Sequence, residues 1–197
     1  MKMQHLVGPA PYYTNSFLLI SDAGHAVIVD PAASAQQVNA LLEKERAQLT
    51  HILLTHGHFD HVYSLEELRA AHHAKLCMCA EDALGHEQLP AKDPELCLED
   101  GDVLEVDEMS FKFWRTPGHT PGSCCILCGD RFFTGDTLFH MAIGRTDLLG
   151  GDPLQMMRSL QKLKELPVSD QTQVLPGHMD FSTMGFERAC NPYLGDL

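Results

Sequence analysis

The stretch Thr55–His61 reads T-H-G-H-F-D-H and directly follows the apolar run Ile52–Leu54. Within six residues it carries four side chains that bind metals well: His56, His58, Asp60 and His61. Imidazole nitrogens and carboxylate oxygens are preferred ligands of zinc and of other divalent first-row metals. The stretch is therefore interpreted as a metal-binding loop at the end of a buried strand.

The spacing of these four residues predicts a loop that serves two metals. His56 and His58 are two positions apart, as on a chain leaving a strand, so both side chains can point the same way. Asp60 and His61 are adjacent and must point in different directions. A single histidine would be an ordinary loop residue, and Asp60 alone could be a helix cap, but four such residues together argue against chance.

The composition is that of an ordinary folded domain and disfavours several classes of partner. The chain has 197 residues, 44% of them hydrophobic, which suits one domain with a sizeable core. Because 27 acidic residues outnumber 14 Lys and Arg, the net charge is −13 and nucleic acid is an improbable partner. We see no signal peptide or membrane span, and therefore expect a cytoplasmic protein. The seven cysteines are expected to be reduced thiols in strands.

The remaining sequence predicts strands that alternate with helices. Turn signals at 22–24 and 129–130 separate pairs of apolar runs and predict two hairpins. Ser34 and Asp152, the latter followed by Pro153, predict helix starts. We expect helices that end near Ala47, His73 and Leu166, and strands at Asn15–Ser21, His25–Asp30, Ile52–Leu54, Lys75–Ala80, Val103–Val106, Ser110–Arg115, Ser123–Cys128, Arg131–Thr134 and Gln173–Leu175.

One pattern recurs at four places along the chain: a short apolar strand ends, and a glycine-containing loop presents a histidine or an aspartate. The loops are T-H-G-H at 55–58, P-G-H at 117–119, G-D-T at 135–137 and P-G-H at 176–178. A rigid strand with a sharp turn at its end fixes the position of a side chain, which a metal site requires. His119, Asp136 and His178 are therefore further candidate ligands.

In order and context, these motifs resemble those of the metallo-β-lactamase superfamily over nearly the whole chain. G-D-T-L-F at 135–139, followed by G-R-T-D at 144–147, is similar to the glyoxalase II (hydroxyacylglutathione hydrolase-like) branch in its short bacterial form. The resemblance implies an α/β fold of four layers, αββα, with two mixed β-sheets between outer helices. It also implies that residues 1–197 form one domain, without the C-terminal helical domain of the two-domain glyoxalase II enzymes.

The resemblance further implies a centre of two divalent metal ions, most readily zinc, with iron or manganese as alternatives. His56, His58 and His119 would bind the first ion. Asp60, His61 and His178 would bind the second, and Asp136 would bridge the two. Asp60 would also have a catalytic role, because it would help to orient the attacking hydroxide.

The activity implied by the resemblance is hydrolysis of a small-molecule thioester such as S-lactoylglutathione. A water shared by two divalent ions ionises near neutral pH, and the bridging hydroxide would attack the carbonyl. Arg145 would bind the substrate through a glutathione carboxylate. The chain departs from the branch in having Asp147 where an aromatic residue is expected. The alternative interpretation of Arg145 is an ion pair with Asp147 or Asp152 that shapes the loop.

Other functions of the same fold stay open at this level. Persulfide dioxygenases share the fold and the G-R-T-D loop but use one iron with two histidines and one aspartate. In such a protein His58, Asp60 or His61 could be present without binding metal. Hydrolysis of a lactone or another ester is a second alternative, and a non-catalytic metal-binding or regulatory protein is a third. The sequence does not predict the oligomeric state.

Overall fold

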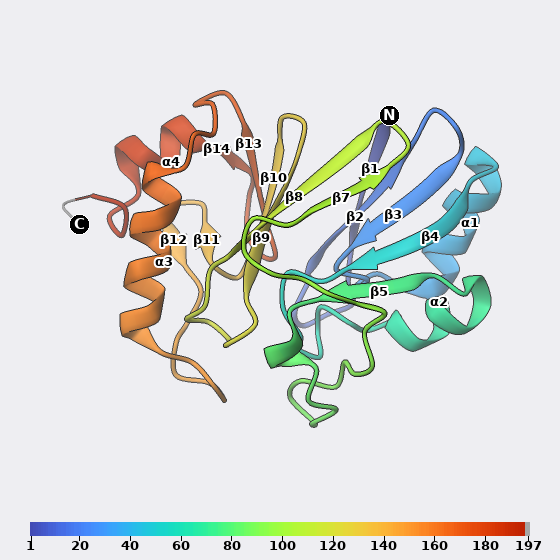
Figure 1. The fold of residues 1–197 in the computed structure, drawn as a ribbon, viewed down its shortest axis with the longest axis horizontal. Helices are drawn as coiled ribbons and strands as arrows, with labels where there is room; N and C mark the ends of the chain where they lie inside the picture. Colours follow the sequence, from blue (N-terminus) through green and yellow to red (C-terminus); the bar gives the residue numbers. More distant parts are fainter. Residues whose placement is uncertain (196–197) are drawn as a thin grey trace.

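The computed structural model describes residues 1–195, and two mixed β-sheets lie at its centre (Figure 1). The first sheet has the strand order β1-β2-β3-β4-β5-β6. Its strands β3, β4, β5 and β6 run parallel, whereas β1 and β2 pair antiparallel. Its elements are β1 Lys2–Val7, β2 Asn15–Ile20, β3 His25–Val29, α1 Ala35–Glu45, β4 Gln48–Leu53, α2 Leu65–His72, β5 Lys75–Met78, the 3-10 helix η1 Ala80–Asp82 and β6 Leu96–Cys97.

The second sheet has the order β14-β13-β10-β9-β8-β7, with only β10 and β13 parallel. Helices α1 and α2 cover the outer side of the first sheet, and α3 and α4 cover the outer side of the second (Figure 1). The predicted fold class, αββα, is confirmed. The remaining elements are β7 Val103–Val106, β8 Met109–Arg115, β9 Cys124–Cys128, β10 Arg131–Gly135, β11 Leu138–Phe139, β12 Ala142–Ile143, α3 Pro153–Glu165, β13 Gln173–Pro176, β14 Ser182–Thr183 and α4 Met184–Cys190.

The hydrophobic core has three parts, because four stacked layers have three interfaces between them. Side chains alternate between the two faces of a strand, so neighbouring residues of β2 enter different parts. Phe17 packs with Phe111 and Phe133 between the sheets. Leu18 packs under α1 and α2, and a third cluster that includes Leu160 lies under α3 and α4. Both faces of the central strands are thus buried, which explains why a strand such as β2 has no exposed face.

Most local predictions are confirmed. The hairpins β2–β3 and β9–β10 form at the expected turns. Ser34 caps α1 in a capping box with Gln37, and Asp152 caps α3. The interpretation of Asp60 as a helix cap is wrong, because α2 begins only at Leu65. Within residues 1–195, no helix has both the length and the apolar character needed to cross a membrane.

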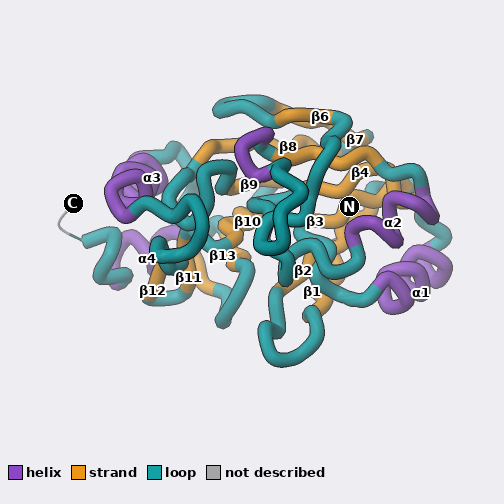
Figure 2. The backbone as a smooth tube through the Cα atoms, turned by 90° about the horizontal axis from the view of Figure 1, so that it is seen from below, coloured by secondary structure: helices purple, strands orange, loops and turns teal. Residues whose placement is uncertain are grey.

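The loops with the candidate ligands lie along one edge of the sandwich. Figure 2 views the molecule from below, where teal loops cover the ends of the central strands. Backbone hydrogen bonds join loops from the two sheets: Cys124 N–H donates to Thr55 O at 2.8 Å, and Asn15 N–H donates to Gly177 O at 2.7 Å. A third bond, from Gly177 N–H to Gly135 O at 2.9 Å, joins the loop at 176–178 directly to the loop at 135–137.

Candidate metal centre

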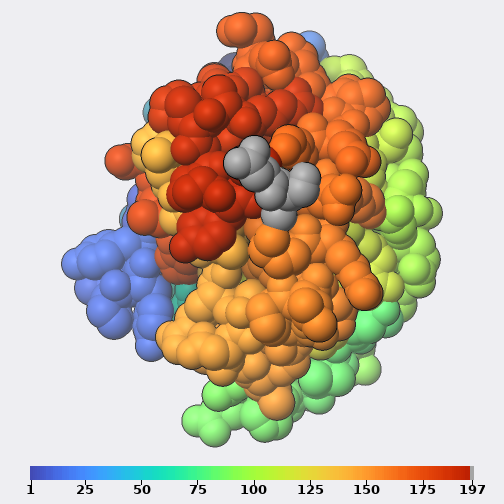
Figure 3. Space-filling view, turned by 90° about the vertical axis from the view of Figure 1, so that its left-hand side faces the viewer, coloured from blue at the N-terminus to red at the C-terminus, as the bar shows by residue number. Residues whose placement is uncertain are grey.

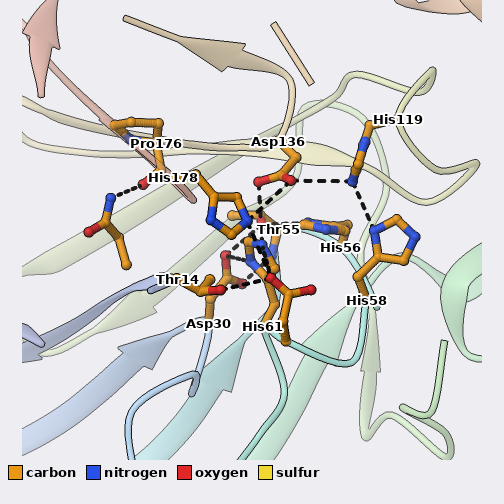
Figure 4. A network of polar contacts seen from close by, with 12 residues as sticks. Thr14, Asp30, Thr55, His56, His58, His61, His119, Asp136, Pro176 and His178 are labelled. Atoms are coloured by element: carbon orange, nitrogen blue, oxygen red, sulfur yellow. Dashed lines mark hydrogen bonds and ion pairs between the residues drawn. The ribbon is translucent and has the colours of Figure 1, made fainter. Parts of the chain in front are cut away.

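The structure brings together all seven side chains that the sequence singled out, and Figure 4 labels all of them except Asp60. The donor atoms of His56, His58 and His119 all lie within 4.8 Å of one another. Those of Asp60, His61 and His178 do so as well. The composition of these two groups is the one that the family resemblance implied for two metal ions.

Asp136 lies between the two groups. Its Oδ1 is 3.3 Å from His61 Nε2, and its Oδ2 is 3.4 Å from His119 Nε2 and 3.5 Å from His178 Nε2. The close approach depends on Gly177, where a Cβ would stand 2.4 Å from Asp136 Oδ1 and 2.5 Å from His61 Cε1. A single carboxylate therefore reaches both groups of candidate ligands.

The donor atoms fit a divalent cation. His56 Nε2, His61 Nε2 and Asp136 Oδ1 are buried and make no hydrogen bond of acceptable geometry within the described residues. Buried polar atoms in proteins are nearly always partnered, so a cluster of unpartnered nitrogen and oxygen atoms calls for another ligand. Nitrogen and oxygen donors suit zinc, iron and manganese alike.

The pKa values of the imidazoles follow from their burial and their charged neighbours. Burial lowers the pKa of His56, and together with the charge of His119 it lowers the pKa of His58 to about 4. These two rings are neutral at pH 7, the form that binds a metal. Burial alone would lower the pKa of His61, but the carboxylates of Asp136 and Asp30 raise it, so a cation would displace a proton from this ring.

The second nitrogen of several rings is anchored to the protein, which fixes the ring orientation. His119 Nδ1 donates to the Arg145 carbonyl at 2.7 Å, and His178 Nδ1 to the Tyr12 carbonyl at 3.2 Å. The Thr14 hydroxyl donates to Asp60 Oδ2 at 2.7 Å. The loop between β1 and β2 thus supports the centre from a distant part of the sequence.

Asp30, at the end of β3, is a supporting residue that the sequence analysis missed. It is buried and accepts hydrogen bonds from the Thr55 backbone N–H at 2.8 Å and from the Thr55 hydroxyl at 2.6 Å. Its Oδ2 lies 2.9 Å from His61 Nδ1. The carboxylate therefore holds the proton on Nδ1 and leaves Nε2 free for a metal. An aspartate that directly follows an apolar strand was the available signal.

Asp82, at the end of η1, is the second missed residue. Its fully buried carboxylate accepts from the Gly57 N–H at 2.9 Å, the Gly122 N–H at 2.7 Å and the Thr120 hydroxyl at 2.6 Å. It thereby ties the loop of His56 and His58 to the loop of His119. Burial raises its pKa in spite of these hydrogen bonds. No local sequence pattern marks this residue.

Asp30→Asn should weaken binding of the ion held by His61 by roughly 10- to 100-fold, the usual effect of losing such a supporting partner. An amide cannot accept from all three donors, and its NH₂ would favour the His61 tautomer that blocks Nε2. Metal per chain, measured by elemental analysis and chelator competition, checks this. Asp107→Asn is the matched control, because Asp107 also contacts a serine hydroxyl and a histidine Nδ1 (Ser21 and His25), at the opposite end of β3. Equal losses in both variants would contradict the expectation.

A cleft of about 540 Å³ opens above the centre and is lined by His58, Asp60, His119, Asp136 and His178 among others. In the space-filling view the loop between β1 and β2, in blue, projects beside the orange residues around position 145 (Figure 3). Arg145, the candidate substrate contact, lies on the cleft wall. Its guanidinium pairs with Asp147, with Nε to Oδ1 at 2.6 Å and Nη2 to Oδ2 at 2.7 Å. The ion pair considered as the alternative is thus present, with Asp147 rather than Asp152.

Comparison with known proteins places these features in a family. The model of the metallo-beta-lactamase superfamily matches residues 9–178. A protein of Aquifex aeolicus (strain VF5) is 35% identical over 190 residues, which cover 89% of this chain and 88% of that protein. Hydroxyacylglutathione hydrolase GloC of Haemophilus influenzae is 31% identical over 199 residues and 93% of each chain.

Solved structures agree with this placement. BLEG-1 B3 metallo-β-lactamase superposes with a TM-score of 0.87 at 31% identity, over 98% of this chain and 99% of that one. ETHE1 from Myxococcus xanthus superposes with a TM-score of 0.83 at 31% identity, over 98% of this chain and 84% of that one. TTHA1623 in a di-iron-bound form superposes with a TM-score of 0.79 at 32% identity, over 95% of this chain and 98% of that one. The chain therefore belongs to the metallo-β-lactamase superfamily of metal-dependent hydrolases, and hydroxyacylglutathione hydrolases are among its relatives.

Proposed function

We propose that this protein is a thioester hydrolase with two divalent metal ions. The observation that carries the proposal is the convergence of seven nitrogen- and oxygen-bearing side chains in one cluster at the base of an open cleft. Two metals account for the two separate groups of donors and for the carboxylate between them. The similarity to GloC supports a thioester as substrate.

The ligand assignment follows the two groups. His56, His58 and His119 would hold one ion and Asp60, His61 and His178 the other, with Asp136 between them. Zinc is our first choice, and iron or manganese would be accepted by the same donors. The similar structure TTHA1623 was solved in a di-iron-bound form, which supports iron as an alternative to zinc.

A pair of divalent ions lowers the pKa of water and stabilises negative charge on a carbonyl oxygen. The chain's own contribution is to place and hold the groups around the reacting atoms. Asp60 Oδ2 accepts from Thr14 and lies 3.2 Å from His178 Nε2, so Oδ1 is available to orient a water in the cleft. Burial alone would raise the pKa of Asp60, but the contacts from His178 and Thr14 lower it and keep the carboxylate charged.

The leaving group explains why a thioester suits this site. A thiol has a pKa near 8.5, so a thiolate departs without a strong acid beside it. The only groups required are those that hold the attacking water and the carbonyl. S-lactoylglutathione is the first substrate to test, and Arg145 at the cleft rim would contact its thiol portion only by releasing Asp147. We also propose that the protein is located in the cytoplasm and does not bind nucleic acid.

Removal of the metals should abolish the activity. Protein purified without added metal is expected to carry two divalent ions per chain by elemental analysis and to release thiol from S-lactoylglutathione. Treatment with a chelator should lower this rate by at least roughly 100-fold, and zinc should restore it, because the metals stabilise the developing charge. Metal-loaded protein that turns over no thioester would contradict the proposal and favour a non-catalytic metal-binding role, or a lactone or ester substrate if these are cleaved.

A persulfide dioxygenase is the second candidate, favoured by the similarity to ETHE1. A group of two histidines and one aspartate, His56, His61 and Asp136, also has its donor atoms within 4.8 Å of one another. Such a group is typical of mononuclear iron oxygenases. One iron per chain, with oxygen uptake on glutathione persulfide, would support this function in place of hydrolysis.

A further inference from the structure

The cleft wall beyond the candidate ligands is mostly apolar, with Gln88 and Arg145 as its polar side chains. Its aromatic and aliphatic side chains come from several loops and from the β11–β12 hairpin, and include Tyr12, Phe59, Phe139, Ile143, Leu148 and Met179. The rings of Tyr12 and Phe59 pack edge to face at 5.1 Å and are 50% and 43% exposed. Large aromatic surfaces left open to solvent beside a catalytic centre are typical of sites that bind apolar groups.

A second recess extends this apolar surface. It has a volume of about 210 Å³ and shares Tyr12, Phe59 and Asp60 with the cleft. The recess is bounded by Pro9 in the loop between β1 and β2 and by Tyr63 just before α2. Because Tyr12, Phe59 and Asp60 line both spaces, an apolar group that lies along Phe59 in the cleft also approaches the recess.

Charge on the cleft wall is nearly absent. Among the described residues that line the cleft, Arg145 is the one charged side chain outside the candidate ligands. Asp147 engages its Nε and Nη2 in a bidentate pair, the geometry that an arginine would use for a carboxylate of a substrate. The Arg145 guanidinium lowers the pKa of Asp147 to about 2, so near pH 7 both groups are charged and the pair has no net charge.

An anionic substrate therefore gains little at this wall. An exposed ion pair is weak in itself. However, a substrate carboxylate would have to displace a partner two residues away on the same loop, and would then lie beside the charge of Asp147. The net charge of −13 further disfavours the approach of anions. Glutathione carries two carboxylates, so its thioesters meet this disadvantage twice.

We propose, on the basis of the thioester hydrolysis proposed above, that the preferred substrates are thioesters whose acyl and thiol groups are both apolar and uncharged. Asp147 is a specificity-determining residue, because it occupies the one guanidinium that could attract a carboxylate. The acyl chain lies along Phe59 toward the recess. In the reaction the oxygen of water bonds to the acyl carbon, the carbon–sulfur bond breaks, and a carboxylic acid and a thiol are released.

A matched pair of substrates tests the charge preference. Hexanoyl-N-acetylcysteamine and hexanoylglutathione share an acyl group and differ in the charge of the thiol. We expect kcat/KM to be about 10-fold higher or more for the uncharged thioester. In the Asp147→Asn variant the difference should shrink several-fold, because the released Arg145 can then pair with a glutathione carboxylate.

Asp170→Asn is the matched control, because Asp170 also pairs with an arginine (Arg188, Nη1 to Oδ1 at 2.6 Å) but lies outside the cleft lining. It should leave the ratio of the two kcat/KM values unchanged. An equal or higher value for hexanoylglutathione in the unmodified protein, or an unchanged ratio in Asp147→Asn, would overturn the inference and leave the proposed function intact. No thiol release from either substrate or from S-lactoylglutathione would overturn the proposed function itself.

Acyl length tests the placement of the chain. Across acetyl, butyryl and hexanoyl thioesters of N-acetylcysteamine, kcat/KM should rise by up to about fourfold for each methylene that is buried. A value that does not change with chain length would refute the position of the acyl group along Phe59. Metal content and circular dichroism of every variant establish that the folded, loaded protein is being compared.

Discussion

Asp136→Asn should lower the rate of thioester hydrolysis by roughly 10²- to 10³-fold, the effect seen when a group that stabilises charge at a reacting centre is removed. Its carboxylate is within 3.5 Å of three imidazole nitrogens, those of His61, His119 and His178. The amide has nearly the same volume, so the fold should persist. It removes a negative charge, however, and turns an NH₂ group toward atoms that donate to metal. Thiol release and metal per chain are the measurements.

Asp130→Asn serves as the control for this variant. Asp130 and Asp136 flank opposite ends of β10, and Asp130 is exposed in a turn, where it pairs with Arg131. Its substitution should change neither metal content nor rate. If Asp136→Asn kept two metals per chain and a rate within about twofold of the unmodified protein, the assignment of Asp136 as a ligand shared by the two ions would be wrong.

Asp82→Asn should weaken binding of the ion assigned to His56, His58 and His119 by about 10- to 100-fold. The carboxylate accepts three hydrogen bonds that join the loop at 56–58 to the loop at 117–122. An amide leaves at least one buried donor unpaired, which costs about 1–3 kcal/mol of stability. The two loops would then no longer be held in register. Chelator competition followed by thermal unfolding measures both effects.

The effect should be specific to one ion. Asp82 contacts the loops of the first group, whereas Asp30 contacts His61 of the second. The two variants should therefore lose different ions first in a stepwise competition. Asp102→Asn is the control, because Asp102 also accepts a backbone N–H, that of Glu99, but at an exposed turn. Loss of both ions together in Asp82→Asn would show that the residue supports the fold as a whole.

The sequence determined much of the fold because its signals are local. Ser34 caps α1, and Asp152 with Pro153 begins α3, since caps act within one helical turn. Turn residues set the β9–β10 hairpin in the same way. The edge strand β1 escaped prediction, because most of its side chains are partly or fully exposed and its place depends on pairing with β2.

The sequence also singled out every residue of the candidate centre, because the ligand-bearing loops share a strand–glycine–ligand pattern. Their grouping into two sets came from the resemblance to a family, and the structure places them accordingly. Their assignment as metal ligands belongs to the proposed function. That residues 1–197 form a single domain is likewise a proposal.

Only the tertiary structure decided which carboxylates support the centre and which partner Arg145 takes. Asp152 caps α3 by accepting from the N–H groups of Leu154 and Gln155, whereas Asp147 forms the pair with Arg145. Asp82 meets the loop of His119 across 40 positions of sequence. Local propensity fixes turns, caps and strands, whereas contacts between distant loops exist only once the two sheets have packed.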